Sequence, residues 1–290
     1  MTALIPKKKL IIYDASAFIH RAWHAGNRTG ADDAGGAALS AVTEILNHTR
    51  KPRVLGHAVV VCFDEPGESL RKMLYPPYKA NRSEKPPELV EQIAQTQEAL
   101  NAFGIATLSK PGVEADDLIA GAVTAMQGLD VACWVVSPDK DLLQLVGPSC
   151  TVYRPFRRWK MAEHDVRVIY GFTADRIADY LALVGDSADN IPGVKRVGDK
   201  AAKALISKHD SIEDMLENAL PKYRKHLQAH REDLLMSRLL VQLRPELAAS
   251  VLPSCPVSYW SSYKSRLEAD TTAAAWWANK LGNRLLLDLL

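Results

Sequence analysis

Short apolar runs that stop at or just before an aspartate recur along the first half of this chain. The runs and the acids that follow them are Leu10–Tyr13 with Asp14, Ala58–Phe63 with Asp64, and Ala132–Val136 with Asp139. Apolar runs of roughly four to eight residues predict buried strands. Between them lie stretches with helical spacing, such as Pro86–Phe103, which ends at Gly104. Buried strands that alternate with helices predict an α/β fold, with a mostly parallel central sheet flanked by helices.

The same patterns place the remaining elements. Further strands are expected at Ile105–Leu108 and Cys150–Tyr153, and helices at Gly36–Arg50, from Glu114–Asp117 and from near Asp139. From Thr173 onward the patterns are helical, over 178–184, 199–208, 212–219 and 222–240. We therefore divide the chain into an α/β domain over 1–172 and a helical domain over 173–290. Residues 65–85 fit neither period, and long irregular segments inside compact domains are usually functional.

Composition excludes several classes of protein. Hydrophobic residues make up 47% and charged residues 24%, which are globular averages and not those of a disordered or fibrous chain. No apolar run is long enough to cross a bilayer, and Lys7–Lys9 precede a run too short for a signal peptide. The four cysteines (62, 133, 150 and 255) have no metal-site spacing, which predicts structural thiols in a reducing compartment. We expect a cytoplasmic protein, in the host cytoplasm if a phage encodes it.

The net charge of +2 hides a segregation of the two signs. Basic side chains gather at Arg71–Lys85, Arg154–Lys160 and Lys195–Lys225, and acidic ones at a few turns. A protein that binds a polyanion through metal ions would show this pattern, and so would an ordinary solvated surface.

Nine acidic side chains are expected at one edge of the sheet, because ligands of open α/β sheets collect beyond the carboxyl ends of the strands. They are Asp14, Asp64, Glu114, Asp116, Asp117, Asp139, Asp141, Asp186 and Asp189. Each alone also suits a helix cap or a solvated turn. Together they would repel one another unless cations intervened, and Mg²⁺ or Mn²⁺ suits all-oxygen ligands. Two such ions, ~3.5–4 Å apart, can activate water and stabilise a leaving oxygen in phosphodiester hydrolysis.

An ordered set of motifs carries a family resemblance. The segments are Tyr13–Ser16, His20–Ala25, Phe63–Asp64, Leu74–Arg82, Val113–Asp117, Ser137–Asp141 and Gly185–Val194. In this order they resemble the 5′-nuclease (flap endonuclease) superfamily, especially stand-alone bacteriophage 5′–3′ exonucleases and the 5′-nuclease domain of bacterial DNA polymerase I. The resemblance implies a PIN-like nuclease core and a helix–three-turn–helix motif over about 180–210. It also implies that all nine acids hold two or more Mg²⁺ ions, for which Mn²⁺ substitutes.

The resemblance further divides the acids between two ions. One ion would lie among Asp64 and the Glu114–Asp117 acids, with Asp14 in support, and the second near Asp139, Asp141, Asp186 and Asp189. A helical arch is implied over about 65–88, with Lys79 and Arg82 clamping the scissile phosphate. Asp14, Lys79 and Arg82 are thus the catalytic candidates.

DNA contacts are implied at the arch, at Arg21 and at the hairpin. Tyr75 would stack on an unpaired base, and the alternative is packing against its Pro-rich turn. The hairpin would offer backbone N–H groups to a duplex phosphate and would bind a potassium ion. Its residues are Gly193, Val194, Lys195, Arg196, Gly198, Lys200 and Lys203. The alternative for these lysines is an exposed basic helix face.

Three features depart from the family pattern. Arg196 stands where the hairpin usually has glycine, which implies strain if that position needs a positive φ. Ala15 and Ala17 replace small residues, with little expected consequence. No polymerase module follows, so we expect the chain to work alone as a monomer or with separate replication proteins.

The leading hypothesis is a metal-dependent 5′–3′ exonuclease and structure-specific 5′ flap endonuclease, which leaves 5′-phosphate and 3′-hydroxyl ends. Its substrates would be DNA 5′ ends, nicks and flaps, in primer or flap removal during replication. The alternatives are a non-catalytic protein of the same fold that binds DNA structures, and a PIN-like nuclease that processes RNA.

Overall fold

The computed structural model describes residues 8–29, 36–252, 269–283 and 286–287. Six strands form one sheet in the order β3-β2-β1-β4-β5-β6. Their bounds are β1 Lys8–Asp14, β2 Ala58–Cys62, β3 Ala106–Leu108, β4 Val131–Val136, β5 Cys150–Arg154 and β6 Trp159–Met161. The first five strands pair in parallel and β6 pairs antiparallel with β5, which confirms the mostly parallel sheet.

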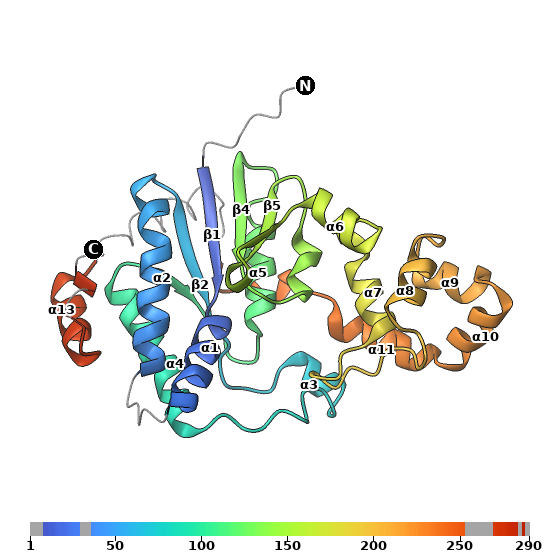
Figure 1. Ribbon diagram of the computed structural model, residues 1–290, viewed down its shortest axis with the longest axis horizontal. Coiled ribbons are helices and arrows are strands. Elements are labelled where there is room, and N and C mark those ends of the chain that lie inside the picture. Colours follow the sequence, from blue (N-terminus) through green and yellow to red (C-terminus); the bar gives the residue numbers. More distant parts are fainter. Residues whose placement is uncertain (1–7, 30–35, 253–268, 284–285, 288–290) are drawn as a thin grey trace.

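Helices cover both faces of the sheet (Figure 1). Those of the first half are α1 Ala15–Thr29, α2 Gly36–Val54, α3 Leu70–Leu74, α4 Pro87–Ala102, α5 Ala115–Thr124 and α6 Glu163–Tyr170. Those that follow are α7 Ile177–Val184, α8 Asp199–Ile206, α9 Ile212–Asn218, α10 Pro221–Ala229, α11 Arg231–Val241 and α13 Thr271–Lys280. None of the described helices is long and apolar enough to cross a membrane.

Alternation along the strands divides the interior into two cores. Ile11 and Tyr13 of β1 face a core that α1, α2, α4 and α13 complete. Leu10 and Ile12 face the other core, which α5 shares with the helical second half. Since successive side chains of a strand point to opposite faces, one short strand contributes to both cores. Helix α13 buries Trp277 in the core of the α/β half, to which the chain thus returns.

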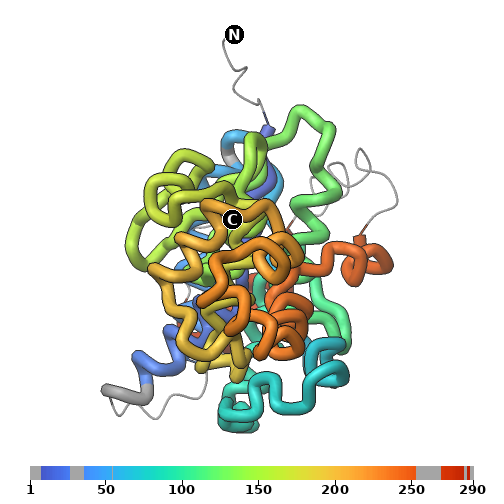
Figure 2. Tube along the Cα trace, turned by 90° about the vertical axis from the view of Figure 1, so that its right-hand side faces the viewer, coloured from blue at the N-terminus to red at the C-terminus, as the bar shows by residue number. Residues whose placement is uncertain are grey.

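The helical second half continues the core beneath α5. Figure 2, turned so that this half faces the viewer, shows α7 to α11 as one stacked group. Leu181 of α7, Leu205 of α8 and Leu234 of α11 are all buried in the core that also holds Leu118 of α5. The two halves are therefore packed together through apolar side chains.

Three sequence expectations differ from the structure, and some elements were not expected. The helix expected over 222–240 breaks at His230 into α10, which packs on α9, and α11, which packs on α7. The helix expected from near Asp139 is only a 3₁₀ turn, η1 (Asp141–Leu145), while β6 and α6 were not predicted. In place of a helical arch over about 65–88, the structure has α3 followed by turns as far as α4. These short elements depend on packing and carry weak periodicity of their own.

Three of the cysteines are buried and free: Cys62, Cys133 and Cys150. Burial raises the pKa of Cys133 to about 12, so this thiol is inert at neutral pH. Free, buried thiols agree with a structural role. Cys255 lies outside the described residues.

Candidate nuclease active site

The acidic side chains reach one edge of the sheet by three routes. Asp14 ends β1, and Asp64 comes two residues after β2. Glu114 is the N-cap residue of α5, and Asp116 and Asp117 lie in its first turn. The other four acids lie in two turns. Asp139 and Asp141 follow β4, and Asp186 and Asp189 follow α7.

Serine hydroxyls hold the central carboxylates in place. Ser137, which is fully buried, donates to Asp14 Oδ2 at 2.7 Å and accepts from the Asp139 backbone N–H at 3.0 Å. Ser16 donates to Asp64 Oδ2 at 2.5 Å, and the Ala115 N–H donates to Asp64 Oδ1 at 2.8 Å. The ends of β1, β2, β4 and α5 are thereby joined by hydrogen bonds to carboxylates and serines.

The carboxylates at the centre repel one another. Burial raises the pKa of Asp14 to about 7, and the charges of Asp64 and Asp139 add to the rise. Burial and the charge of Asp139 raise the pKa of Asp141 to about 7. Burial also raises the pKa of Asp116 well above its usual value. The charges of five acids therefore affect one another at this centre: Asp14, Asp64, Asp116, Asp139 and Asp141.

Asp64 behaves differently from its neighbours. Burial favours its neutral form, but the hydrogen bonds from Ala115 and Ser16 outweigh burial, and its pKa lies below the usual value. It is thus an ionised carboxylate next to acids whose pKa values are raised. Pairs of acids whose environments separate their pKa values are typical of functional sites.

Lysine and arginine side chains pair with three of the acids: Asp186, Asp189 and Glu114. Lys140 Nζ lies 2.6 Å from Asp186 Oδ2, Arg82 pairs with Asp189, and Lys79 Nζ lies 2.6 Å from Glu114 Oε1. The five central acids, by contrast, form no ion pair with any described residue. They are Asp14, Asp64, Asp116, Asp139 and Asp141.

The donor set of this centre suits a hard divalent cation. Oδ1 of Asp141 is buried without a hydrogen-bond partner, and the neighbouring ligand atoms are carboxylate oxygens. As the described side chains stand, no three His, Cys, Asp or Glu residues converge closely enough to hold a metal ion. The residues fit a cation by the chemistry of their oxygens and by their charge, and not by a preformed arrangement of ligands.

The basic segment after α3 lies against the acidic turn after α7. The Lys79 N–H donates to the Asp189 carbonyl at 2.9 Å, and Asn81 Nδ2 donates to the Ser187 carbonyl at 2.7 Å. In the opposite direction, Asn190 Nδ2 donates a hydrogen bond to the Pro77 carbonyl at 2.8 Å. Lys79 and Arg82 are thus placed beside the acids, as their predicted role requires.

Two further predicted DNA contacts are Tyr75 and Arg21. Tyr75 is half-buried and packs on the apolar core, and its stacking on an unpaired base stays a prediction. Arg21 is exposed, pairs with Glu44 at 2.9 Å and lies over the Phe156 ring, 4.2 Å from its centroid.

The hairpin between α7 and α8 is built on two glycines. A Cβ atom on Gly193 would lie 2.5 Å from the Gly185 backbone nitrogen, and both glycines have positive φ. The Gly193 N–H donates to the buried Ser237 hydroxyl at 3.0 Å. Arg196 has a φ of 68°. This arginine therefore adopts the positive φ for which the sequence predicted strain, because the family usually has glycine at this position.

The hairpin side chains divide into two groups. Val194 is buried, whereas Lys195, Arg196, Gly198 and Lys200 are exposed. Lys203 turns back, with Nζ 2.9 Å from Asp199 Oδ1. The exposed group remains available to a phosphate backbone.

Several residues of the site were not assigned a role from the sequence. They are Ser16, Ser137, Arg71 and Tyr78. A serine one or two residues from an aspartate at the end of an apolar strand is a local signal for the first two. Arg71 and Tyr78 have no such signal, because their partner Glu114 is distant in sequence.

Two family models match this chain. A 5′-3′ exonuclease N-terminal resolvase-like domain matches residues 9–171, and a 5′-3′ exonuclease C-terminal SAM fold matches 172–257. A 5′-3′ exonuclease of Aquifex aeolicus (strain VF5) is 35% identical over 242 residues, 83% of this chain and 83% of that protein. This chain belongs to the 5′-3′ exonuclease family. It shares the family's nuclease class of enzyme, and α13 lies beyond both matches.

Longer relatives and solved structures agree with this membership. The thermostable DNA polymerase I of Thermus aquaticus is 32% identical over 85% of this chain, which spans only 30% of the polymerase. A structure of T5 5′-exonuclease with divalent zinc ions bound has a TM-score of 0.69 and 20% identity, and covers 91% of this chain and 99% of its own. The catalytic core of Rad2 with a DNA substrate has a TM-score of 0.57 and 14% identity, over 96% of this chain and 88% of its own. At these identities the structures show a shared fold.

Proposed function

We propose that this member of the 5′-3′ exonuclease family is a divalent-metal-dependent nuclease that cleaves DNA at 5′ ends, nicks and flaps. The observation that carries the proposal is the group of five acids without a cation from the described residues, with the unpartnered Asp141 Oδ1 among them. Relatives support it, because T5 flap endonuclease has been solved with DNA and metal ions. The products would carry 5′-phosphate and 3′-hydroxyl ends.

The central acids would hold the ions, and Mg²⁺ is the ion we propose, with Mn²⁺ as a substitute. The bound ions would supply an activated water and stabilise the leaving oxygen. Asp186 and Asp189, which Lys140 and Arg82 now neutralise, complete the proposed ligand set together with Glu114, which pairs with Lys79 and Arg71. Ser137 holds Asp14 and Asp139 in a fixed relation, which limits reorganisation when an ion binds.

Lys79 and Arg82 would act on the scissile phosphate. Both side chains lie at the acidic edge and are held by carboxylates, so a phosphate that entered would meet two cations there. A fixed cation beside a reacting phosphate stabilises the charge that develops in the transition state.

The hairpin after α7 would bind the duplex without reading its sequence. Its exposed lysines and Arg196 lie next to the N-terminus of α8, where backbone N–H groups point outward. The potassium ion that the family resemblance implies here remains part of this proposal, as does a role in flap removal beside replication proteins.

The decisive experiment is cleavage of a 5′-flapped duplex labelled at its 5′ end. We expect short labelled products with Mg²⁺, none with chelator, and none with Asp139→Asn. Asp210→Asn, an exposed acid in the helical half, is the matched control and should cleave normally. An intact but gel-shifted substrate would favour a non-catalytic DNA-binding protein, and faster cleavage of an RNA flap would favour an RNA-processing enzyme.

A further inference from the structure

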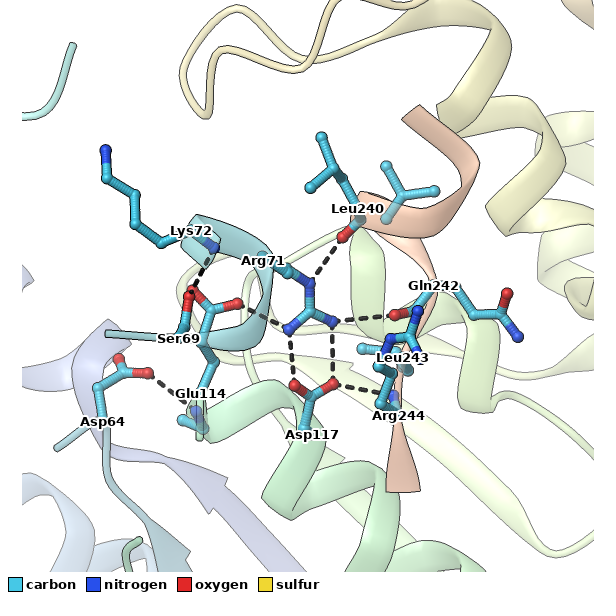
Figure 3. A network of polar contacts seen from close by, with 12 residues as sticks. Asp64, Ser69, Arg71, Lys72, Glu114, Asp117, Leu240, Gln242, Leu243 and Arg244 are labelled. Atoms are coloured by element: carbon cyan, nitrogen blue, oxygen red, sulfur yellow. Dashed lines mark hydrogen bonds and ion pairs between the residues drawn. The ribbon is translucent and has the colours of Figure 1, made fainter. Parts of the chain in front are cut away.

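Arg71 is a buried arginine at the junction of three parts of the chain (Figure 3). It comes from α3, in the irregular segment before α4, and only 4% of the residue is exposed. Its guanidinium uses all five N–H bonds. The acceptors are Leu240 O at 2.7 Å, Glu114 Oε2 at 2.8 Å, Asp117 Oδ2 at 2.6 Å, Asp117 Oδ1 at 2.9 Å and Gln242 O at 2.9 Å.

Asp117 is fully committed to this network. The residue is 1% exposed, its two oxygens accept two parallel bonds from Arg71, and Oδ1 also accepts the Arg244 N–H at 2.9 Å. A bidentate arginine–carboxylate pair is the strongest and most directional form of this interaction. In this arrangement Asp117 lies away from the centre, where its neighbour Asp116 faces the charges of Asp14, Asp64 and Asp139.

Glu114 receives its orientation from the segment that carries Arg71. Its Oε2 accepts from Arg71 and from the Tyr78 hydroxyl at 3.1 Å, and its Oε1 accepts from Lys79. All three donors lie within ten residues of one another in sequence. Of these three, Arg71 alone also donates to backbone carbonyls at the C-terminal end of α11, those of Leu240 and Gln242.

We propose that Arg71 is a positioning residue that sets Glu114 for the reaction, and that Asp117 anchors Arg71 rather than binding a metal ion. This inference rests on the proposed function for the role of Glu114. One guanidinium thereby couples the segment before α4, the α5 acids and the helical half that carries the hairpin. Lysine could not replace it, because an ammonium group offers three donors and no planar fork.

A double-mutant cycle tests the anchor role without relying on activity. Mn²⁺ affinity of the full chain is measured by calorimetry, without DNA, for wild type, Arg71→Met, Asp117→Asn and the double variant. If Asp117 acts only through Arg71, the double variant binds Mn²⁺ as weakly as the weaker single variant, within about twofold. If Asp117 is a ligand, the two losses multiply, and that result would overturn the inference.

Single-turnover cleavage at saturating DNA tests the positioning role. Residues that orient a ligand typically cost roughly 10- to 100-fold when lost, and we expect Arg71→Met to slow cleavage in that range while its DNA affinity changes by less than about threefold. Arg176→Met is the matched control, because Arg176 is a half-buried arginine that binds Asp179 at 2.9 Å and the His209 carbonyl at 2.8 Å. It should lower the thermal unfolding temperature and leave the rate unchanged. Equal slowing by both variants would reduce Arg71 to a structural residue.

Arg71→Lys protects the test against misfolding, since it keeps the buried charge opposite Asp117. A folded Arg71→Lys with the wild-type rate and Mn²⁺ affinity would contradict the positioning role. The two proposals fail in different ways. A wild-type chain that binds no Mn²⁺ and cleaves nothing would refute the proposed function, whereas an active wild type with a multiplicative cycle refutes only this inference.

Discussion

Substitution of Gly193 by alanine should unfold the hairpin locally and weaken the whole chain. The new Cβ would lie 2.5 Å from the Gly185 nitrogen and 2.7 Å from the Gly185 Cα, both backbone atoms that cannot swing away. Gly193 also has a φ of 61°, a conformation that costs an L-residue about 1–2 kcal/mol.

The magnitude follows from three contributions. The left-handed backbone costs about 1–2 kcal/mol and the overlap with Gly185 about 1–3 kcal/mol, while alanine recovers about 0.4–1 kcal/mol by restricting the unfolded chain. The expected loss in the free energy of unfolding is therefore about 1–5 kcal/mol.

Urea unfolding followed by circular dichroism measures this loss. Gly147→Ala is the matched control, because a Cβ there has nothing within 4 Å and its φ is not positive. We expect the control to change the free energy of unfolding by less than about 0.5 kcal/mol. If Gly193→Ala is no more destabilised than Gly147→Ala, the close approach of the two glycines does not hold the hairpin together.

Three further predictions concern charge and strain. Arg196→Gly should raise the free energy of unfolding by about 0.5–1 kcal/mol in urea titrations. The reason is that relief of the positive φ exceeds the cost of the added chain entropy in the unfolded state. Unchanged or lower stability would contradict strain at Arg196. Lys200→Ala should lower the slope of log Kd against log salt concentration by about 0.9. Lys203→Ala should leave this slope unchanged, because Asp199 holds the Lys203 ammonium group. Equal slopes for the two variants would show that Lys200 is not in the DNA interface. In chelator, the free energy of unfolding should fall as pH rises from about 4 to about 7, because the pKa of Asp141 is about 7 in the folded state against 3.8 in the unfolded state. Over that range the unfolded state has lost the Asp141 proton and the folded state still holds it. Urea titrations of wild type and Asp141→Asn test this, and a variant with an equally steep fall would assign the effect to other groups.

The local sequence predicted the strands well because their patterns are strong. Runs such as Ala58–Phe63 are apolar throughout, and only the interior of a covered parallel sheet accepts such a run. Asp14 is the last residue of β1 and Asp64 comes two residues after β2, so the parallel order brings both to one edge of the sheet. The break at His230 had no glycine or proline to announce it, and the change of direction lets α10 and α11 pack on different neighbours.

The sequence by itself determined which acidic and basic residues belong to the site at the edge of the sheet. What only the tertiary structure decided is their pairing. Asp116 and Asp117 are adjacent in sequence and indistinguishable by type, yet successive residues of a helix point about a quarter turn apart. One therefore meets the carboxylate centre, and the other meets Arg71 and the backbone after α11. Such a distinction depends on side-chain direction and on partners far along the chain, which no local pattern records.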